Sequence, residues 1–285
     1  MIDEFRISQA MNKLTIEAGK TERQYWRDLW KYRELFYFLA WRDLLVRYKQ
    51  TVVGVAWSVI RPLLTMIVLT IVFGLLAKIK SGGAPYPLLV FCGMLPWMFF
   101  ATALTECGNS LVGNSNLISK VYFPRLIVPT SSVIISLVDF LISSLLLVIL
   151  MIWYRFVPSA DIFFLPLFVI LAFGAAFGAG LWTAALMVEY RDFRFIVPFV
   201  VQIGFYVTPV GYSSSLVVER YKQYQMLFSL NPLVGIIDGF RWCILGGEQT
   251  LYWPAQAMAV GWVALLVTSG IWFFRRTERT FADVI

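Results

Sequence analysis

Histidine is absent from this 285-residue sequence, and cysteine occurs only three times, at widely separated positions. The lack of histidine excludes histidine-based catalysis and histidine metal ligands. An odd, unclustered set of cysteines does not fit a disulfide framework or a cysteine zinc site, so we expect three packed free thiols and no metal site. The first fifty residues are polar and lack the short apolar core of a secretory signal peptide.

Charge is also scarce. Only 14% of the residues are charged, 59% are hydrophobic, and the mean hydropathy is +0.73. Soluble domains are about half apolar and about a quarter charged. The sequence therefore indicates a membrane protein, and its length fits one polytopic unit rather than several soluble domains.

Catalytic motifs are missing as well. The sequence contains no G-x-x-x-x-G-K-[ST] segment, so the chain cannot cradle ATP phosphates in a P-loop. It also lacks a G-x-S-x-G or H-E-x-x-H motif and a cluster of paired carboxylates. We therefore expect a protein that is not an enzyme and that carries no cofactor of its own.

Long apolar runs are what the sequence does contain. Each can form a helix of roughly 20 residues, which is the length that crosses about 30 Å of hydrocarbon. Helices are expected because, in lipid, backbone polar groups must be satisfied within the segment. The predicted fold class is thus all-α, with six transmembrane helices. They are Val52–Ala77, Leu88–Leu104, Val133–Tyr154, Ile162–Val188, Ile196–Val210 and Pro254–Phe274.

The lysines and arginines that flank these runs predict the orientation, because cytoplasmic loops carry an excess of them. Placing the N-terminus in the cytoplasm gives a clear inner excess, so we expect a multi-pass protein of the bacterial inner membrane with both termini cytoplasmic. The net charge of +7 is then mostly a topology signal, not a sign of nucleic-acid binding. The predicted inner cations are Arg42, Arg47, Lys49, Arg61, Lys120, Arg125, Arg191, Arg194, Arg275, Arg276 and Arg279, and the outer ones are Lys78, Lys80, Arg155, Arg220, Lys222 and Arg241.

The region before the first span is predicted to be a cytoplasmic part, residues 1–51, followed by a membrane domain, residues 52–285. Within the first part, Glu22–Lys49 places tryptophan and leucine at helical spacing, with cations on another face. A basic amphipathic helix of this kind lies in the membrane interface. A packed soluble helix is the alternative.

A second short helix is predicted after the fifth span, in NPLVGIIDGFRWCILGG. Asn231 and Pro232 suit a helix start, and the following glycine pair suits a stop. The piece is apolar but too short to cross, so we expect a re-entrant or interfacial helix on the outer side. Asp238 and Arg241 are three residues apart and can neutralise each other there.

Asp139 lies inside the third predicted span, where a carboxylate costs about 2.5–3.5 kcal/mol on insertion scales and needs a partner or water. A polar contact between helices and an ion or proton site both remain open. Gly174 and Gly178 in the fourth span are expected to permit close helix packing.

The connector NLISKVYFPRLIVP, Asn116–Pro129, is unusually apolar for a loop. We expect Asn116 to cap a short helix that Pro124 stops. The helix has two candidate locations, the membrane surface and a groove on a cytoplasmic partner. In the second case Tyr122 and Phe123 would enter the groove, while Lys120 and Arg125 would pair with acidic groups at its rim.

Four stretches together carry a family resemblance: RYKQTVVGVAWSVIRPLL, LISKVYFPRLIVP, EYRDFRFIVPF and NPLVGIIDGFRW. With them the chain resembles the permease of ABC-2 type polysaccharide exporters, which move O-antigen, capsular polysaccharide or teichoic acid, and it is most similar to O-antigen permeases. The resemblance implies a permease homodimer with two separate ATPase subunits that hold ATP and Mg²⁺. The implied substrate is a polysaccharide on an undecaprenyl diphosphate carrier.

The resemblance also implies roles for particular residues. A coupling helix between spans two and three and the loop at Glu189–Arg194 would contact the ATPase. The implied contact residues are Leu117, Ser119, Lys120, Tyr122, Phe123, Arg125 and Arg191. Spans one and five would line a conduit at the dimer interface, where Trp57, Phe73, Phe199 and Tyr206 are candidate sugar contacts; core packing is the alternative for each ring. The short outer helix would gate the far side through Asn231, Pro232, Asp238 and Arg241.

Three other functions compete with this one. An ion-coupled secondary transporter would need several intramembrane ionisable groups and an internal repeat, and we find Asp139 and no repeat. A membrane-embedded lipid or sugar transferase is disfavoured by the missing carboxylate and histidine clusters. An ABC-2 drug or lipid exporter would share the topology, but its substrates would not need an aromatic-lined conduit.

Overall fold

The computed structural model describes residues 22–49, 54–79, 83–220, 222–246 and 251–281, and these residues form helices and connections with no strand among them. The all-α prediction is confirmed. In chain order the elements are α1 (Glu22–Lys31), α2 (Arg33–Lys49), α3 (Gly54–Leu69), η2 (Thr70–Leu76), α4 (Tyr86–Gly113), α5 (Ser115–Lys120), α6 (Ile127–Trp153), η3 (Ala160–Phe164), α7 (Leu165–Glu189), α8 (Phe193–Val207), α9 (Ser214–Arg220), η4 (Lys222–Tyr224), α10 (Gln225–Phe228), α11 (Pro232–Leu245), α12 (Trp253–Thr277) and η5 (Glu278–Thr280).

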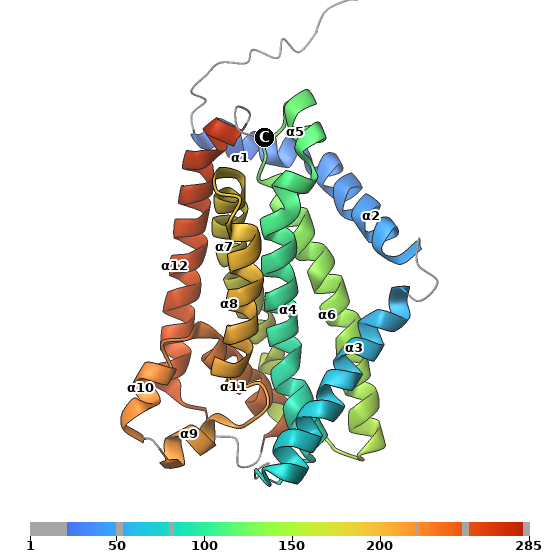
Figure 1. The fold of residues 1–285 in the computed structure, drawn as a ribbon, viewed down its shortest axis with the longest axis vertical. Coiled ribbons are helices and arrows are strands. Elements are labelled where there is room, and N and C mark those ends of the chain that lie inside the picture. Colours follow the sequence, from blue (N-terminus) through green and yellow to red (C-terminus); the bar gives the residue numbers. More distant parts are fainter. Residues whose placement is uncertain (1–21, 50–53, 80–82, 221, 247–250, 282–285) are drawn as a thin grey trace, which may run out of the picture.

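Five of the described helical segments are long and apolar enough to cross a membrane. They run roughly side by side as a bundle, with α5 and α1 at one end and α9 to α11 at the other (Figure 1). We refer to these as the α5 end and the α11 end. The five segments are Ala56–Leu76, Tyr86–Gly113, Ile127–Trp153, Ala160–Glu189 and Trp253–Thr280.

The predicted fifth span is shorter than the others. Its helix, α8, has 15 residues and therefore covers only about 22 Å. The chain beyond α8 completes the distance: the Tyr86 hydroxyl, at the start of α4, donates to the carbonyl of Gly211 over 2.7 Å. Since α8 begins beside the end of α7 at the α5 end, the stretch from Phe193 to Gly211 runs the length of the bundle (Figure 1).

The core lies around α4, which packs along α6 and α7, while α7 packs along α12. Every residue from Leu88 to Trp97 is buried, and the three cysteines are buried free thiols, as expected. The predicted close packing of the fourth span is also found. A Cβ at Gly178 would lie 2.5 Å from the carbonyl carbon of Leu266, and one at Gly270 would lie 2.5 Å from the Gly178 carbonyl oxygen.

The short helix predicted after the fifth span is present as α11, which meets the preceding Lys222–Phe228 pair at 104°. The Asn231 side chain accepts a hydrogen bond from the Leu233 amide over 3.0 Å, and Pro232 occupies the first turn. Gly246 ends the helix with φ of +54°, which favours glycine. This bent pair lies at the α11 end of the bundle (Figure 1), and its angle fits either a broken span or a re-entrant loop, so the re-entrant or interfacial placement stays a prediction.

Several sequence-based boundaries were wrong, among them the end of the second span, because α4 continues from the predicted Leu104 to Gly113. The N-terminal amphipathic helix is divided at Tyr32 into α1, which lies across the α5 end, and α2, which slopes beside α6 (Figure 1). In the connector, Asn114 takes the N-cap position predicted for Asn116, and α5 ends at Lys120, one turn before Pro124. Apolar residues after Pro124 then start α6 at Ile127, six residues before the predicted span.

Aromatic side chains cover the outer surface of α1 and α2. The rings of Tyr37 and Trp41 stack with centroids 6.3 Å apart. Exposed tryptophan and tyrosine rings at a polar boundary are typical of a membrane interface, where their amphipathic rings are stable. The large exposed rings of these helices are Trp26, Trp30, Tyr37, Phe38 and Trp41.

Candidate functional site

The connector between α4 and α6 forms one wall of a cavity of about 520 Å³ at the α5 end. After α5 the backbone is extended at Val121, so the next side chains alternate in direction instead of sharing a helical face. Val121 and Tyr122 are half exposed, at 50% and 49%. The residues from Ile118 to Arg125 line the cavity together with Tyr25, Asp28, Arg275, Glu278 and Arg279.

Phe123 does not take the place predicted for it. Its side chain is 4% exposed and belongs to the hydrophobic core, and Leu117 packs partly buried against that core. The expectation that Phe123 enters a partner's groove is therefore wrong for this conformation, because the ring would first have to leave the core. Val121 and Tyr122 are the apolar side chains that the connector presents.

Arg125 also has a different role from the predicted rim cation. Its backbone amide donates to the Glu278 carboxylate over 3.0 Å, and its guanidinium donates to the Glu278 backbone carbonyl. The Tyr25 hydroxyl donates to the same carboxylate over 3.4 Å, and the Arg275 guanidinium lies 4.4 Å from the Tyr25 ring centre. Glu278 therefore joins α1, the connector and the end of α12.

Burial, and then the nearby Glu278 carboxylate, raises the pKa of Tyr25. The phenol consequently stays protonated and acts as the donor in this contact.

Among the residues predicted to couple to an ATPase, Ser119 and Lys120 are exposed and line this cavity.

Arg191 lies in the turn between α7 and α8. It is exposed and lines a second cavity of about 500 Å³ with Arg194, Phe195 and residues of α4 and α5 such as Asn109 and Ser115. The two predicted contact regions, the connector and this turn, are thus both at the α5 end.

Asp139 pairs with Arg47, a cation that the sequence places in the flank before the first span. Its carboxylate is 3.1 Å from the Arg47 guanidinium, at the end of α2, and it accepts a hydrogen bond from the Tyr48 hydroxyl. Burial, and then this hydrogen bond, raises the pKa of Tyr48 to about 12, so the phenol remains a donor. Arg47 also lies 3.6 Å from Glu106. Of the two alternatives for Asp139, the structure contains the polar contact between helices.

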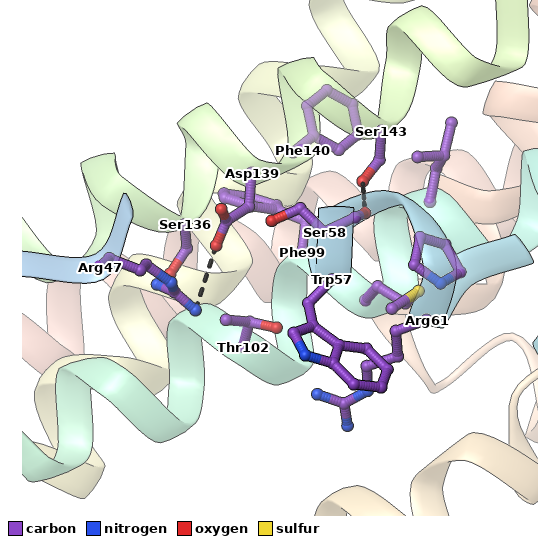
Figure 2. Close-up of a pocket in the computed structure, with 13 residues that line it drawn as sticks. Arg47, Trp57, Ser58, Arg61, Phe99, Thr102, Ser136, Asp139, Phe140 and Ser143 are labelled. Atoms are coloured by element: carbon purple, nitrogen blue, oxygen red, sulfur yellow. Dashed lines mark hydrogen bonds and ion pairs between the residues drawn. The ribbon is translucent and has the colours of Figure 1, made fainter. Parts of the chain in front are cut away.

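Beside this ion pair is a pocket of about 290 Å³ between α2, α3, α4 and α6, shown in Figure 2. Its polar lining includes the hydroxyls of Ser58, Thr102, Ser136 and Ser143, and its apolar lining includes Phe99 and Phe140. Trp57 and Arg61 project from α3 toward the same side of the pocket (Figure 2). We call this the α3 pocket.

The four predicted conduit residues have two different environments. Trp57, Phe199 and Tyr206 lie on the outer surface of α3 and α8, with exposures of 59%, 61% and 68%. Phe73 is only partly exposed, because its ring packs against Gly211 and lies 6.4 Å from the ring of Tyr212. The first three are available to a partner or substrate, whereas Phe73 supports the end of the fifth crossing.

The predicted gate residues surround the loop after α8. Arg241 is fully buried and donates to the carbonyls of Val210 and Tyr212 over 2.8 Å each and to that of Leu89 over 3.2 Å. Asp238 accepts from the Ser214 hydroxyl over 2.7 Å. Asp238 and Arg241 interact electrostatically, as expected, and each also has hydrogen bonds to other groups.

Asn231 adds a further link at this end of the bundle. Its side-chain amide donates to the Thr208 hydroxyl over 2.9 Å while its oxygen caps α11. Asn231 and Arg241 thus both hold the segment that follows α8, one at its start and one at its end.

The described residues thus form a bundle of apolar helices long enough to cross a membrane, with a bent helix pair before the last of them and two further helices, α1 and α2, before the first. The ABC-2 type transporter family matches residues 34–245, about three quarters of the chain, and the chain belongs to this family.

Individual relatives match over almost the whole chain. The O-antigen export system permease protein RfbA of Myxococcus xanthus is 29% identical over 260 residues, which cover 91% of this chain and 98% of the relative. Two proteins of the same name from Klebsiella pneumoniae are 27% and 26% identical over 253 residues, which cover 88% of this chain and 95% of each relative.

Proposed function

We propose that this chain is the transmembrane permease subunit of an ATP-driven exporter of lipid-linked polysaccharide, with O-antigen on an undecaprenyl diphosphate carrier as its cargo. The observation that carries this proposal is that relatives named as O-antigen export permeases match along at least 88% of the chain. That alignment includes the connector, the α7–α8 turn and α11, so it is not confined to the apolar spans.

The proposed mechanism divides the work between chains. ATP and Mg²⁺ bind a separate ATPase subunit, which contacts the connector and the α7–α8 turn at the α5 end. Two permease copies face each other across α3 and α8 and enclose the conduit. The exposed rings of Trp57, Phe199 and Tyr206 support this arrangement, because aromatic faces stack on sugar rings.

The α5 end is proposed to face the cytoplasm of a bacterium, with the chain in the inner membrane. Lys120, Arg191, Arg194, Arg275 and Arg279 all belong to segments at this end, which agrees with the positive-inside rule. Both α1 and η5 also lie there, so both described ends of the chain would be cytoplasmic.

An ion-coupled mechanism receives no support from Asp139. That carboxylate was its candidate site, and it is engaged by Arg47 and Tyr48 from α2. An ion would have to displace a charged guanidinium from the carboxylate before it could bind.

The proposed ATPase contact predicts the effect of Tyr122→Ala. A large ring that enters a partner's groove often dominates the interface, and its truncation costs about 2 kcal/mol or more, roughly thirtyfold in affinity. We expect the variant to insert and fold normally, while the ATPase co-purifies poorly and polymer accumulates inside the cell. The measurement is the ratio of ATPase to permease after affinity purification, together with surface polysaccharide.

Tyr224→Ala is the matched control, because Tyr224 is exposed to a similar extent, 51% against 49%, and lies at the α11 end. Lys120→Ala should be milder and more sensitive to salt, as is typical of charges at an interface rim. Full ATPase recovery with Tyr122→Ala would contradict the docking proposal. A stronger loss with Lys120→Ala and unaffected ATPase recovery would instead favour contact with lipid headgroups.

The proposed orientation is tested separately by cysteine labelling. In a background without the three native cysteines, Ser214→Cys at the α11 end should react with a membrane-impermeant thiol reagent added to intact cells. Lys120→Cys and Arg191→Cys at the α5 end should react only after the membrane is permeabilised. Labelling at position 120 but not at 214 in intact cells would reverse the topology.

A further inference from the structure

Arg61 is a charged residue in an apolar place. It lies within the candidate span Ala56–Leu76, about 8 Å along the helix from the start of that span, and it is exposed on the bundle surface. Among the described residues, no ion pair, hydrogen bond or ring contact of its guanidinium is found. A cation in a span is costly unless it reaches a counter-charge or water.

The surroundings of Arg61 supply the other parts of a polar binding site. Ser58 and Thr102 contribute hydroxyls to the α3 pocket, and Trp57, four residues before Arg61 and on the same face of α3, stands at its open side (Figure 2). Tryptophan is the residue most typical of the boundary between lipid headgroups and hydrocarbon. Hydroxyls beside an arginine can donate to an anion's oxygens that the guanidinium leaves free.

The negative charge of the pocket is already compensated. Asp139 is paired with Arg47 and accepts a hydrogen bond from Tyr48, so it does not neutralise Arg61. The lining as a whole holds two arginines and one carboxylate. Glu106, which lies 3.6 Å from Arg47, is outside this lining. The charge inside the pocket that has no counter-charge is therefore that of Arg61, which an anion entering from the side of the bundle would balance.

Beyond Arg61, the same helix offers an apolar surface to a hydrocarbon chain. Large aliphatic side chains are exposed along α3 and η2 and continue for the rest of the span. They are Leu64, Ile67, Val68, Ile71, Val72, Leu75 and Leu76, with exposures between 42% and 75%. A molecule with an anionic head and a long apolar tail matches this sequence of surfaces.

We propose that the α3 pocket binds the phosphate headgroup of a lipid, with Arg61 as the main ligand, Ser58 and Thr102 as additional donors, and the lipid chain along α3. Arginine suits this role because its planar set of N–H donors matches phosphate oxygens. In a membrane, phosphate is the anion that is carried on hydrocarbon chains at this depth. The source is a bilayer phospholipid or a polyprenyl diphosphate; the second source rests on the proposed function, whereas the first does not.

The test is native mass spectrometry of the purified full-length chain with four added lipids. Dioleoyl phosphatidylglycerol and geranylgeranyl diphosphate carry phosphate, whereas dioleoylglycerol and geranylgeraniol have the same chains without it. We expect both phosphate-bearing lipids to bind and their phosphate-free counterparts to bind at least about tenfold more weakly, because a charge-assisted hydrogen bond is lost. This assay needs neither ATPase nor polysaccharide, so its result is independent of the export assay.

Three variants assign the binding to the α3 pocket. Arg61→Gln should weaken the binding of both phosphate-bearing lipids by about tenfold, and Arg61→Lys should weaken it less, because lysine keeps the charge but lacks the planar set of donors. Arg194→Gln removes an exposed arginine elsewhere at the α5 end and should leave binding unchanged, which controls for general contact with headgroups. Size-exclusion profiles of all variants establish whether they remain folded. If Arg61→Gln does not fold, a measurable loss of phosphate-dependent binding in Arg61→Lys supports the proposal, and unchanged binding contradicts it.

Competition between the two phosphate-bearing lipids identifies the source. Displacement of phosphatidylglycerol by the diphosphate from the native chain, but not from Arg61→Gln, supports a carrier site; retention of phosphatidylglycerol supports a phospholipid site. Equal binding of lipids with and without phosphate would overturn the proposal. So would an Arg61→Gln variant that changes the oligomeric state and leaves lipid affinity intact, because Arg61 would then pair with a second copy of the chain.

Discussion

We expect the Arg241→Leu substitution to leave most of the protein unfolded. The substitution keeps a long apolar side chain but deletes the donors for the carbonyls of Val210, Tyr212 and Leu89. A buried carbonyl left without a donor costs about 1–3 kcal/mol, so the total reaches several kcal/mol, a large part of the 5–15 kcal/mol that stabilises a typical protein. We expect the thermal transition in detergent to fall by roughly 10 °C or more.

Arg155→Leu is the matched control for this prediction, because Arg155 is an exposed arginine in the turn after α6, at the same end of the bundle. It should melt like the native chain. A melting temperature unchanged by Arg241→Leu would mean that the segment after α8 holds its position without these hydrogen bonds. Gly93 belongs to the same contact, since a Cβ there would lie 2.4 Å from the Arg241 guanidinium.

The second large effect is expected at the contact between α7 and α12. In Gly178→Ala the new methyl group would lie 2.5–2.7 Å from the backbone of Leu266 and Val267, and a helix backbone cannot yield as a flexible side chain can. Overpacking of this kind costs typically 1–3 kcal/mol and separates the two helices. The variant should be less stable and recovered in lower yield, as measured by thermal unfolding and by fluorescence-detected size exclusion.

Gly261→Ala makes the same chemical change in α12 with the opposite expectation. No atom lies within 4 Å of a Cβ at Gly261. Alanine is more favourable than glycine in a helix by about 1 kcal/mol, so this variant should be unchanged or slightly more stable. If both variants behave alike, helix propensity and not close packing decides the outcome at Gly178.

The spans could be predicted from the sequence because each depends on a local property, a run of apolar residues of sufficient length. The same holds for α11, where Asn231, Pro232 and Gly246 mark both ends of the helix with residues suited to those positions. The close packing at Gly178 was also predictable, because small residues four apart have few other uses in a span.

Contacts between distant parts of the chain were not predictable in this way. The Glu278 carboxylate accepts a hydrogen bond from the backbone amide of Arg125, which lies 153 residues earlier in the chain, and no local sequence pattern predicts that contact. An apolar residue in a connector, such as Phe123, suggests a docking residue, but its burial depends on helices that follow much later in the chain. Arg47 stands in the flank before the first span, and nothing in the sequence indicates its pairing with a carboxylate inside the third span.

The contact at Glu278 has a consequence for the order in which the molecule is made. The connector and α1 emerge from the ribosome early, whereas Glu278 follows every crossing in the chain. The hydrogen bonds that Tyr25 and the Arg125 amide donate to the Glu278 carboxylate can therefore form only after α12 has been synthesised and inserted. In a chain interrupted before that point, the connector would lack its contacts with Glu278. The surface that contains Val121 and Tyr122 would therefore reach its final position only when the whole bundle is complete.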